Sequence, residues 1–155
     1  RNTAELRAVT VFTALSFYDL GKFEESLKHY DAARKIRDSS TLASNMGLCC
    51  NRLGNYSRAA ELYEEAIQLD SSNAFAYNNL SALFFAQGEY ENALDAAKDA
   101  LECNERMPQA LSTAAICCKL LGYEEDYSHY YRRAVAAGYD GDKIKQFLKQ
   151  LDSKI

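Results

Sequence analysis

Apolar residues recur at intervals of three and four positions along most of the chain, the spacing that places them on one face of an α-helix. The pattern is interrupted by glycines and by short polar runs such as Asp38-Ser39-Ser40, whose side chains favour turns and helix N-caps. With one Pro and seven Gly, helix breakers are few. The pattern therefore predicts helices over residues 4–20, 23–37, 41–53, 56–69, 74–87, 90–103, 108–121 and 124–137.

Four glycines recur with a fixed period. Gly21, Gly54, Gly88 and Gly122 follow one another at intervals of 33, 34 and 34 residues, and an alanine stands twelve residues after each of them. Glycine suits these places because it adopts the left-handed conformation that ends a helix without a side-chain clash. A period near 34 residues over four copies indicates a solenoid of helical hairpins.

Two segments carry a specific resemblance: "GNYSRAAELYEEAIQLD" (54–70) and "YNNLSALFFAQGEYENALDAAKDAL" (77–101). With the glycine and alanine ladders, the chain resembles the tetratricopeptide repeat family over residues 7–141. The resemblance implies an all-α fold, a right-handed superhelical solenoid of four helix-turn-helix repeats that forms a single domain. The repeats would span residues 7–39, 40–73, 74–107 and 108–141.

Residues 142–155 repeat nothing and form a separate amphipathic segment, with lysines around an apolar stripe of Ile144, Phe147, Leu148, Leu151 and Ile155. A stack of repeats leaves its last apolar face uncovered, so the segment is expected to be a C-terminal capping helix. We expect the tyrosines at 123, 127, 130, 131 and 139 to help build the face that it covers. The alternative is a basic amphipathic helix that lies on a membrane.

Charge and composition limit the classes of partner that the chain is expected to bind. The net charge of −4 lacks the basic balance of nucleic-acid binders, so no nucleic acid is expected. No apolar run approaches the roughly 20 residues that span a bilayer, so no membrane partner is expected. Five cysteines, an odd number in a chain long enough to form a core without disulfides, point to a reducing, cytoplasmic compartment.

Two adjacent cysteine pairs, Cys49–Cys50 and Cys117–Cys118, raise the question of a metal site, a redox couple or a disulfide. They occupy equivalent positions two repeats apart, where the other repeats carry Ser16–Phe17 and Leu83–Phe84. Because Leu and Phe replace Cys there, and because neighbouring helical side chains diverge by about 100°, we interpret the cysteines as core residues. We predict no metal, no cofactor and no catalytic residue, hence no enzyme.

The resemblance also implies a groove lined by the first helix of each repeat, in which family members bind peptide segments of other proteins. Asn45 and Asn79 lie 34 residues apart at equivalent places, so they are expected to form a ladder that binds the amides of an extended peptide. The alternative is that either Asn caps a helix, bonds a neighbour or faces water. The predicted peptide-binding residues are Phe12, Leu15, Asn45, Leu48, Arg52, Phe75, Asn78, Asn79 and Lys119.

The apolar members of this set would anchor the ligand, with Phe85 either a further anchor or a packing residue, and Arg52 and Lys119 could select an acidic side chain. Family members that hold chaperone C-terminal tails use Lys, Asn and Arg side chains at the places occupied here by Val11, Leu15, Asn45, Phe75 and Asn79. Of these five residues only Asn45 matches the residue type that those family members have at its position, so chaperone tails are not expected as ligands.

The function predicted from sequence is therefore a protein–protein interaction scaffold that takes a peptide or helical segment of a partner in the groove. One alternative is self-association into a homodimer through the first helix, with Val9, Val11, Phe12 and Leu15. Another is a non-catalytic part of a larger enzyme or sensor, which the sequence upstream of Arg1 would reveal.

Overall fold

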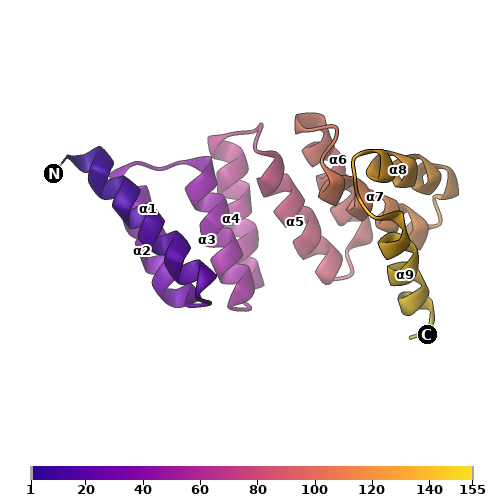
Figure 1. Ribbon diagram of the computed structural model, residues 1–155, viewed down its shortest axis with the longest axis horizontal. Helices are drawn as coiled ribbons and strands as arrows, with labels where there is room; N and C mark the ends of the chain where they lie inside the picture. Colours follow the sequence, from indigo (N-terminus) through magenta and orange to yellow (C-terminus); the bar gives the residue numbers. More distant parts are fainter. Residues whose placement is uncertain (1, 155) are drawn as a thin grey trace. The chain divides into compact units, whose positions relative to one another are not determined.

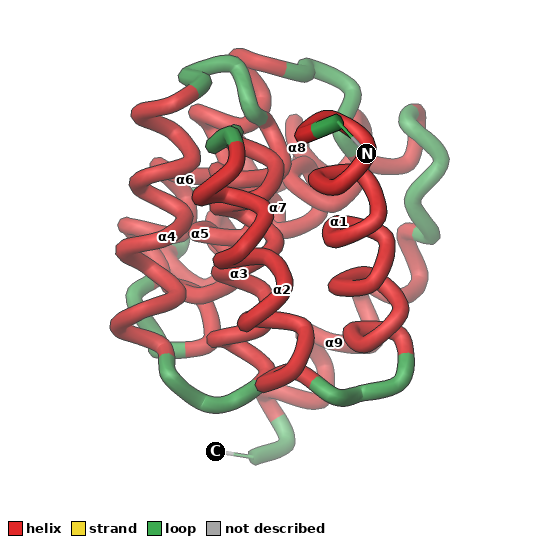
Figure 2. The backbone as a smooth tube through the Cα atoms, turned by 90° about the vertical axis from the view of Figure 1, so that its left-hand side faces the viewer, coloured by secondary structure: helices red, strands yellow, loops and turns green. Residues whose placement is uncertain are grey.

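The computed structural model describes residues 2–154, and within this range the chain is all-α, without a strand. Figure 2 shows the helices joined by short loops. This confirms the predicted fold class. The helices are α1 (Thr3–Asp19), α2 (Phe23–Ile36), α3 (Ser40–Arg52), α4 (Tyr56–Leu69), α5 (Ala74–Ala86), α6 (Tyr90–Cys103), α7 (Pro108–Leu121), α8 (Glu124–Ala136) and α9 (Gly141–Asp152).

Local sequence explains where the helices begin and end. The side chain of Asn2 accepts a hydrogen bond from the Glu5 amide at 2.8 Å and caps α1, and Ser39 caps α3 in the same way. The turn after α7 passes through Gly122, whose φ of 82° is the left-handed conformation expected there. Each predicted end of α1 to α8 lies within one residue of the observed one.

The chain forms two compact units, an N-terminal unit that ends at Ala76 and a C-terminal unit that begins at Tyr77. In the N-terminal unit α1 pairs with α2 and α3 pairs with α4, as Figure 1 shows, and α2 also packs on α3. The buried hydroxyl of Ser26 on α2 donates to the Ala14 carbonyl of α1 at 2.7 Å. Small buried residues permit such close contact between helices, among them Ala14, Ala33, Ala43, Ala66 and Ala76.

At Gly47, α3 approaches α4 closely. It is buried, and a Cβ atom built on it would lie 2.5 Å from Cε1 and 2.7 Å from Cδ1 of Tyr63. Tyr63 is itself fully buried, with 0% of its surface exposed, and its hydroxyl has no hydrogen-bond partner among residues 2–154. The absence of a side chain at position 47 therefore makes room for the tyrosine ring.

In the C-terminal unit, the buried hydroxyl of Ser81 on α5 donates to the Ala93 carbonyl of α6 at 2.7 Å. The helices α6, α7 and α8 pack in sequence, and α9 contacts both α7 and α8. Ile144 of α9 is buried, and the ring centroid of Phe147 lies 5.9 Å from that of Phe85 on α5. A helix thus covers the end of the last hairpin, where a cap was expected.

The observed α9 corrects the predicted bounds of 142–155, because it runs from Gly141 to Asp152. Asp140 caps its start, and the hydroxyl of Ser153 donates to the Gln150 carbonyl at its end. Ile155, the last residue of the predicted apolar stripe, lies outside the described residues.

Only part of the predicted tyrosine face borders α9. Lys145 of α9 lies over the ring of Tyr131, 5.3 Å from its centroid. Tyr123, by contrast, is 41% exposed and donates its hydroxyl to Glu91 of α6. It is therefore a link between α6 and the start of α8, and the prediction that it lies under the cap is wrong.

The paired cysteines are buried, as predicted. Cys49 and Cys50 lie in the core of the N-terminal unit, and Cys117 and Cys118 in that of the C-terminal unit. Burial raises the pKa of all four thiols, to about 12 for Cys117 and about 11 for Cys118. Cys103, at the end of α6, is exposed. None of the helices within residues 2–154 combines the length and apolar character needed to cross a membrane.

Candidate functional site

The N-terminal unit exposes large apolar side chains at the predicted groove positions. Phe12 on α1 is 72% exposed and Phe75 at the start of α5 is 67% exposed. Leu15, three residues after Phe12 and thus on the same face of α1, is 43% exposed, whereas Leu48 on α3 is half-buried. Most of the surface of Phe12 and Phe75 is thus exposed, so core packing does not explain the apolar residue type at these two positions.

Asn45 on α3 lies near the buried Tyr30 on α2. Tyr30 is almost completely buried, and burial is the main cause that raises its pKa to about 12, while Asn45 acts to lower that pKa. A carboxamide offers two donors and two acceptor lone pairs, so the half-buried Asn45 has the capacity to bond a ligand.

Arg52, at the end of α3, lies over the ring of Phe23 with its guanidinium carbon 5.0 Å from the ring centroid. A cation over an aromatic face keeps its N–H groups available to an acceptor. Asn45, Leu48 and Arg52 follow one another at spacings of three and four residues, so they share one face of α3.

The predicted residues of the C-terminal unit are more strongly engaged. Asn78 and Asn79 are half-buried at the start of the unit, and Asn79 makes further polar contacts. The ammonium of Lys119 on α7 lies 2.9 and 3.0 Å from the two carboxylate oxygens of Glu124 and 5.2 Å from the ring centroid of Tyr127. A ligand carboxylate would compete with Glu124 for Lys119. Because Asn45 and Asn79 belong to different units, the asparagine ladder stays a prediction.

The C-terminal unit contains a cavity that the sequence did not predict. It has a volume of about 370 Å3 and lies where α5, α7 and α9 meet, lined by Phe85, Ser112, Thr113, Ile116, Tyr139, Lys143 and Phe147. Phe85 also packs on Tyr90, with ring centroids 5.3 Å apart, so it is in part a packing residue. The amphipathic stripe of α9 contains Phe147, but sequence alone did not show which neighbouring helices that ring would meet.

The geometry has the features of a binding surface. Within residues 2–154 no group of three or more His, Cys, Asp or Glu side chains could hold a metal ion. The aromatic and aliphatic side chains of α1 and the polar groups of α3 instead offer apolar contact and hydrogen bonds to a partner.

Comparison with known proteins identifies the family of the chain. The model of the tetratricopeptide repeat family matches residues 8–72 and 38–106. Photosystem I assembly protein Ycf3 of Synechococcus elongatus is 31% identical over 83 residues, which cover 52% of this chain and 48% of that protein. The chain therefore aligns with only about half the length of this relative.

Solved structures share the fold at low sequence identity. A crystal structure of MamA superposes with a TM-score of 0.77 at 15% identity, covering 84% of this chain and 77% of the other. The first tetratricopeptide repeat domain of Spaghetti (RPAP3), bound to the HSP90 peptide SRMEEVD, superposes with a TM-score of 0.70 at 20% identity. That match covers 75% of this chain and 93% of the other.

Proposed function

Because the chain belongs to the tetratricopeptide repeat family, whose fold serves as a scaffold for protein–protein interaction, we propose that it binds a peptide or helical segment of a partner on the first helices of its repeats. The binding surface comprises the exposed faces of α1 and α3 and the start of α5. The four repeats and α9 act together as one domain, without catalysis and without a cofactor.

The observation that carries the proposal is the exposure of two phenylalanines at groove positions, 72% for Phe12 and 67% for Phe75. A micromolar complex requires about 8 kcal/mol, and each hydrogen bond to an asparagine supplies only about 0.5–1.5 kcal/mol net. Burying one phenylalanine or leucine side chain contributes about 1.5–3 kcal/mol. The apolar side chains therefore provide most of the affinity, while Asn45 sets the position of the peptide.

A displayed library of random peptides tests this proposal. We expect the wild-type protein to select peptides with apolar or aromatic residues, and Phe12→Ala to weaken their binding about tenfold or more. Tyr56→Ala is the matched control, because Tyr56 is an aromatic residue with 49% exposure on a second helix, α4. If Phe12→Ala and Tyr56→Ala lowered the affinity for the peptides equally, or if neither lowered it, the proposed surface would be excluded.

The partner is a protein segment other than a chaperone tail. The SRMEEVD peptide held by the Spaghetti domain is acidic and ends in a carboxylate. At the places expected to hold such a tail this chain has Val11, Leu15 and Phe75 in addition to two asparagines. We therefore expect SRMEEVD not to bind. The buried thiols agree with a reducing, cytoplasmic location, which belongs to the same proposal.

Self-association is the second candidate, because α1 exposes four large apolar side chains along its length. Leu6, Val9, Phe12 and Leu15 are 49%, 48%, 72% and 43% exposed, while Val11 is half-buried. Sedimentation velocity over a wide concentration range tests it. A dimer that Val9→Asp dissociates would support this function, and a monomer at every concentration would exclude it. The third interpretation, a non-catalytic part of a larger enzyme or sensor, is tested by the sequence upstream of residue 1.

A further inference from the structure

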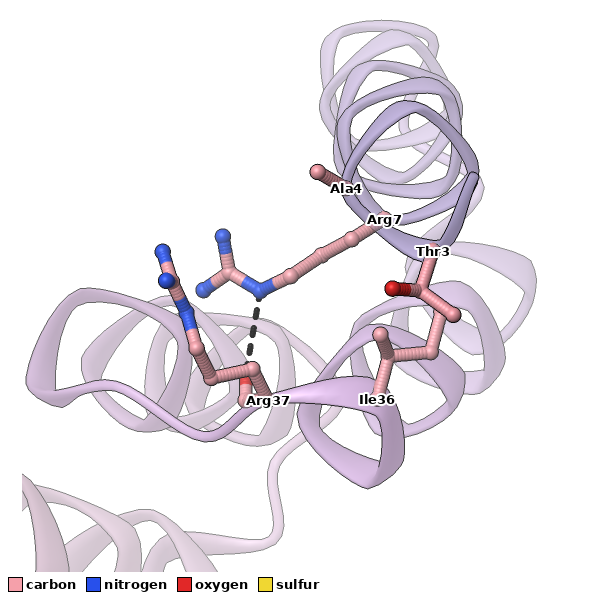
Figure 3. Close-up of a pocket in the computed structure, with 5 residues that line it drawn as sticks. All are labelled: Thr3, Ala4, Arg7, Ile36 and Arg37. Atoms are coloured by element: carbon pink, nitrogen blue, oxygen red, sulfur yellow. Dashed lines mark hydrogen bonds between the residues drawn. The ribbon is translucent and has the colours of Figure 1, made fainter. Parts of the chain in front are cut away.

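A cavity of the N-terminal unit lies where the first turn of α1 meets the end of α2 (Figure 3). Its volume is about 220 Å3, and it is lined by Thr3, Ala4, Arg7, Ile36 and Arg37. None of these residues is among the predicted peptide-binding residues, so the cavity is separate from the surface proposed above.

Two guanidinium groups lie beside one another at this cavity. The Nε–H of Arg7 donates to the backbone carbonyl of Arg37 at 2.9 Å, which ties the side chain of α1 to the loop after α2. Figure 3 shows the side chain of Arg37 rising next to that of Arg7, with the two guanidinium groups on the same side. Neighbouring like charges repel each other, and a bound anion would remove that repulsion.

The first turn of α1 adds to the positive potential of the cavity. The N-cap Asn2 accepts from the Glu5 amide, whereas the amides of the preceding positions have no acceptor within the helix. A helix N-terminus favours an anion, and the hydroxyl of Thr3 lies at the same wall of the cavity.

The acidic groups near the cavity leave its charge positive. Asp38 is bound through both carboxylate oxygens by Arg34, at 2.7 and 2.9 Å, and this ion pair is the main reason that its pKa is lowered. Arg7 contributes a smaller lowering of the same pKa. Glu5 is exposed and does not line the cavity.

We propose that this cavity binds the dianion of a phosphate monoester, with Arg7 and Arg37 on its oxygens and the first turn of α1 behind it. One guanidinium fork already satisfies the two oxygens of a carboxylate. Two forks and a helix N-terminus match the three free oxygens of a phosphate monoester, which carries nearly two negative charges at pH 7. The phosphate is either a free small molecule or a phosphorylated serine of a partner.

The test is a titration of the full chain by two-dimensional NMR with inorganic phosphate, and separately with a short peptide that carries one phosphoserine. We expect shifts concentrated at Thr3, Ala4, Arg7 and Arg37, and weaker binding at higher salt. Binding of the peptide but not of inorganic phosphate assigns the site to a phosphorylated partner, and the reverse assigns it to a free phosphate.

Arg37→Gln is the decisive variant, because the hydrogen bond from Arg7 goes to the Arg37 backbone carbonyl, which the substitution keeps. We expect about tenfold weaker binding, the typical effect of losing hydrogen bonds to a charged group. Arg132→Gln, which removes the same charge from an exposed position on α8, should leave binding unchanged. Shifts spread over the whole surface, or equal losses in the two variants, would overturn the proposal without bearing on the peptide-binding surface.

Discussion

Gly47 offers the sharpest test of how the hairpins pack. Replacing it by Ala in the helix α3 should favour folding by about 1 kcal/mol from helix propensity alone. The added Cβ, however, would lie 2.5 Å from Cε1 of Tyr63, whose ring is fully buried. Overpacking of this kind costs about 1–3 kcal/mol. We therefore expect Gly47→Ala to lower the free energy of unfolding by up to about 2 kcal/mol.

The assay is urea unfolding followed by far-UV circular dichroism, in the wild type and in a Tyr63→Leu background. Without the tyrosine ring the clash is absent, so Gly47→Ala should raise the unfolding free energy there by up to about 1 kcal/mol. The effect of the methyl group thus changes sign between the two backgrounds. The same effect in both backgrounds would show that the ring at 63 is not what requires glycine at 47.

Four further predictions concern individual side chains. Tyr63→Phe removes a buried hydroxyl without a partner and should raise the unfolding free energy by about 1 kcal/mol in the same urea assay. Gly141→Ala would bring a Cβ against the hydroxyl of Tyr131, so it should increase hydrogen exchange in α9 while the N-terminal unit is unchanged. The exposed Cys103 should react with iodoacetamide in the folded protein, while the four buried cysteines react only on unfolding, as counted by mass spectrometry. Since folding raises the pKa of Cys117 from 9.0 to about 12, its contribution to stability is complete below pH 9 and is lost as the pH rises toward 12, which alkaline melting curves would show.

The periodic features of the chain were predictable because each rests on local chemistry that recurs. Glycine at the ends of first helices and serine or asparagine before later ones place the helix ends nearly to the residue. The burial of Cys117 followed from the apolar residues that replace it in another repeat. These inferences need no knowledge of which side chains meet in space.

The features that sequence did not reveal depend on contacts between separate helices. Asn45 on α3 lies near Tyr30 on α2, and no spacing rule predicts this proximity. The cavity beside Phe147 exists because α9 packs against α7 and reaches Phe85 of α5, whereas the amphipathic pattern of α9 gave only an apolar face. The length of α9 was overestimated because the apolar pattern continues past the helix end at Asp152.

Amide-shift mapping of the 155-residue chain with a peptide selected from the displayed library tests the central claim most directly. If partners bind on the first helices, the shifted residues should lie on α1, α3 and the start of α5, around Phe12, Asn45 and Phe75. Shifts concentrated on the second helices, for example around Tyr56 on α4, would contradict it.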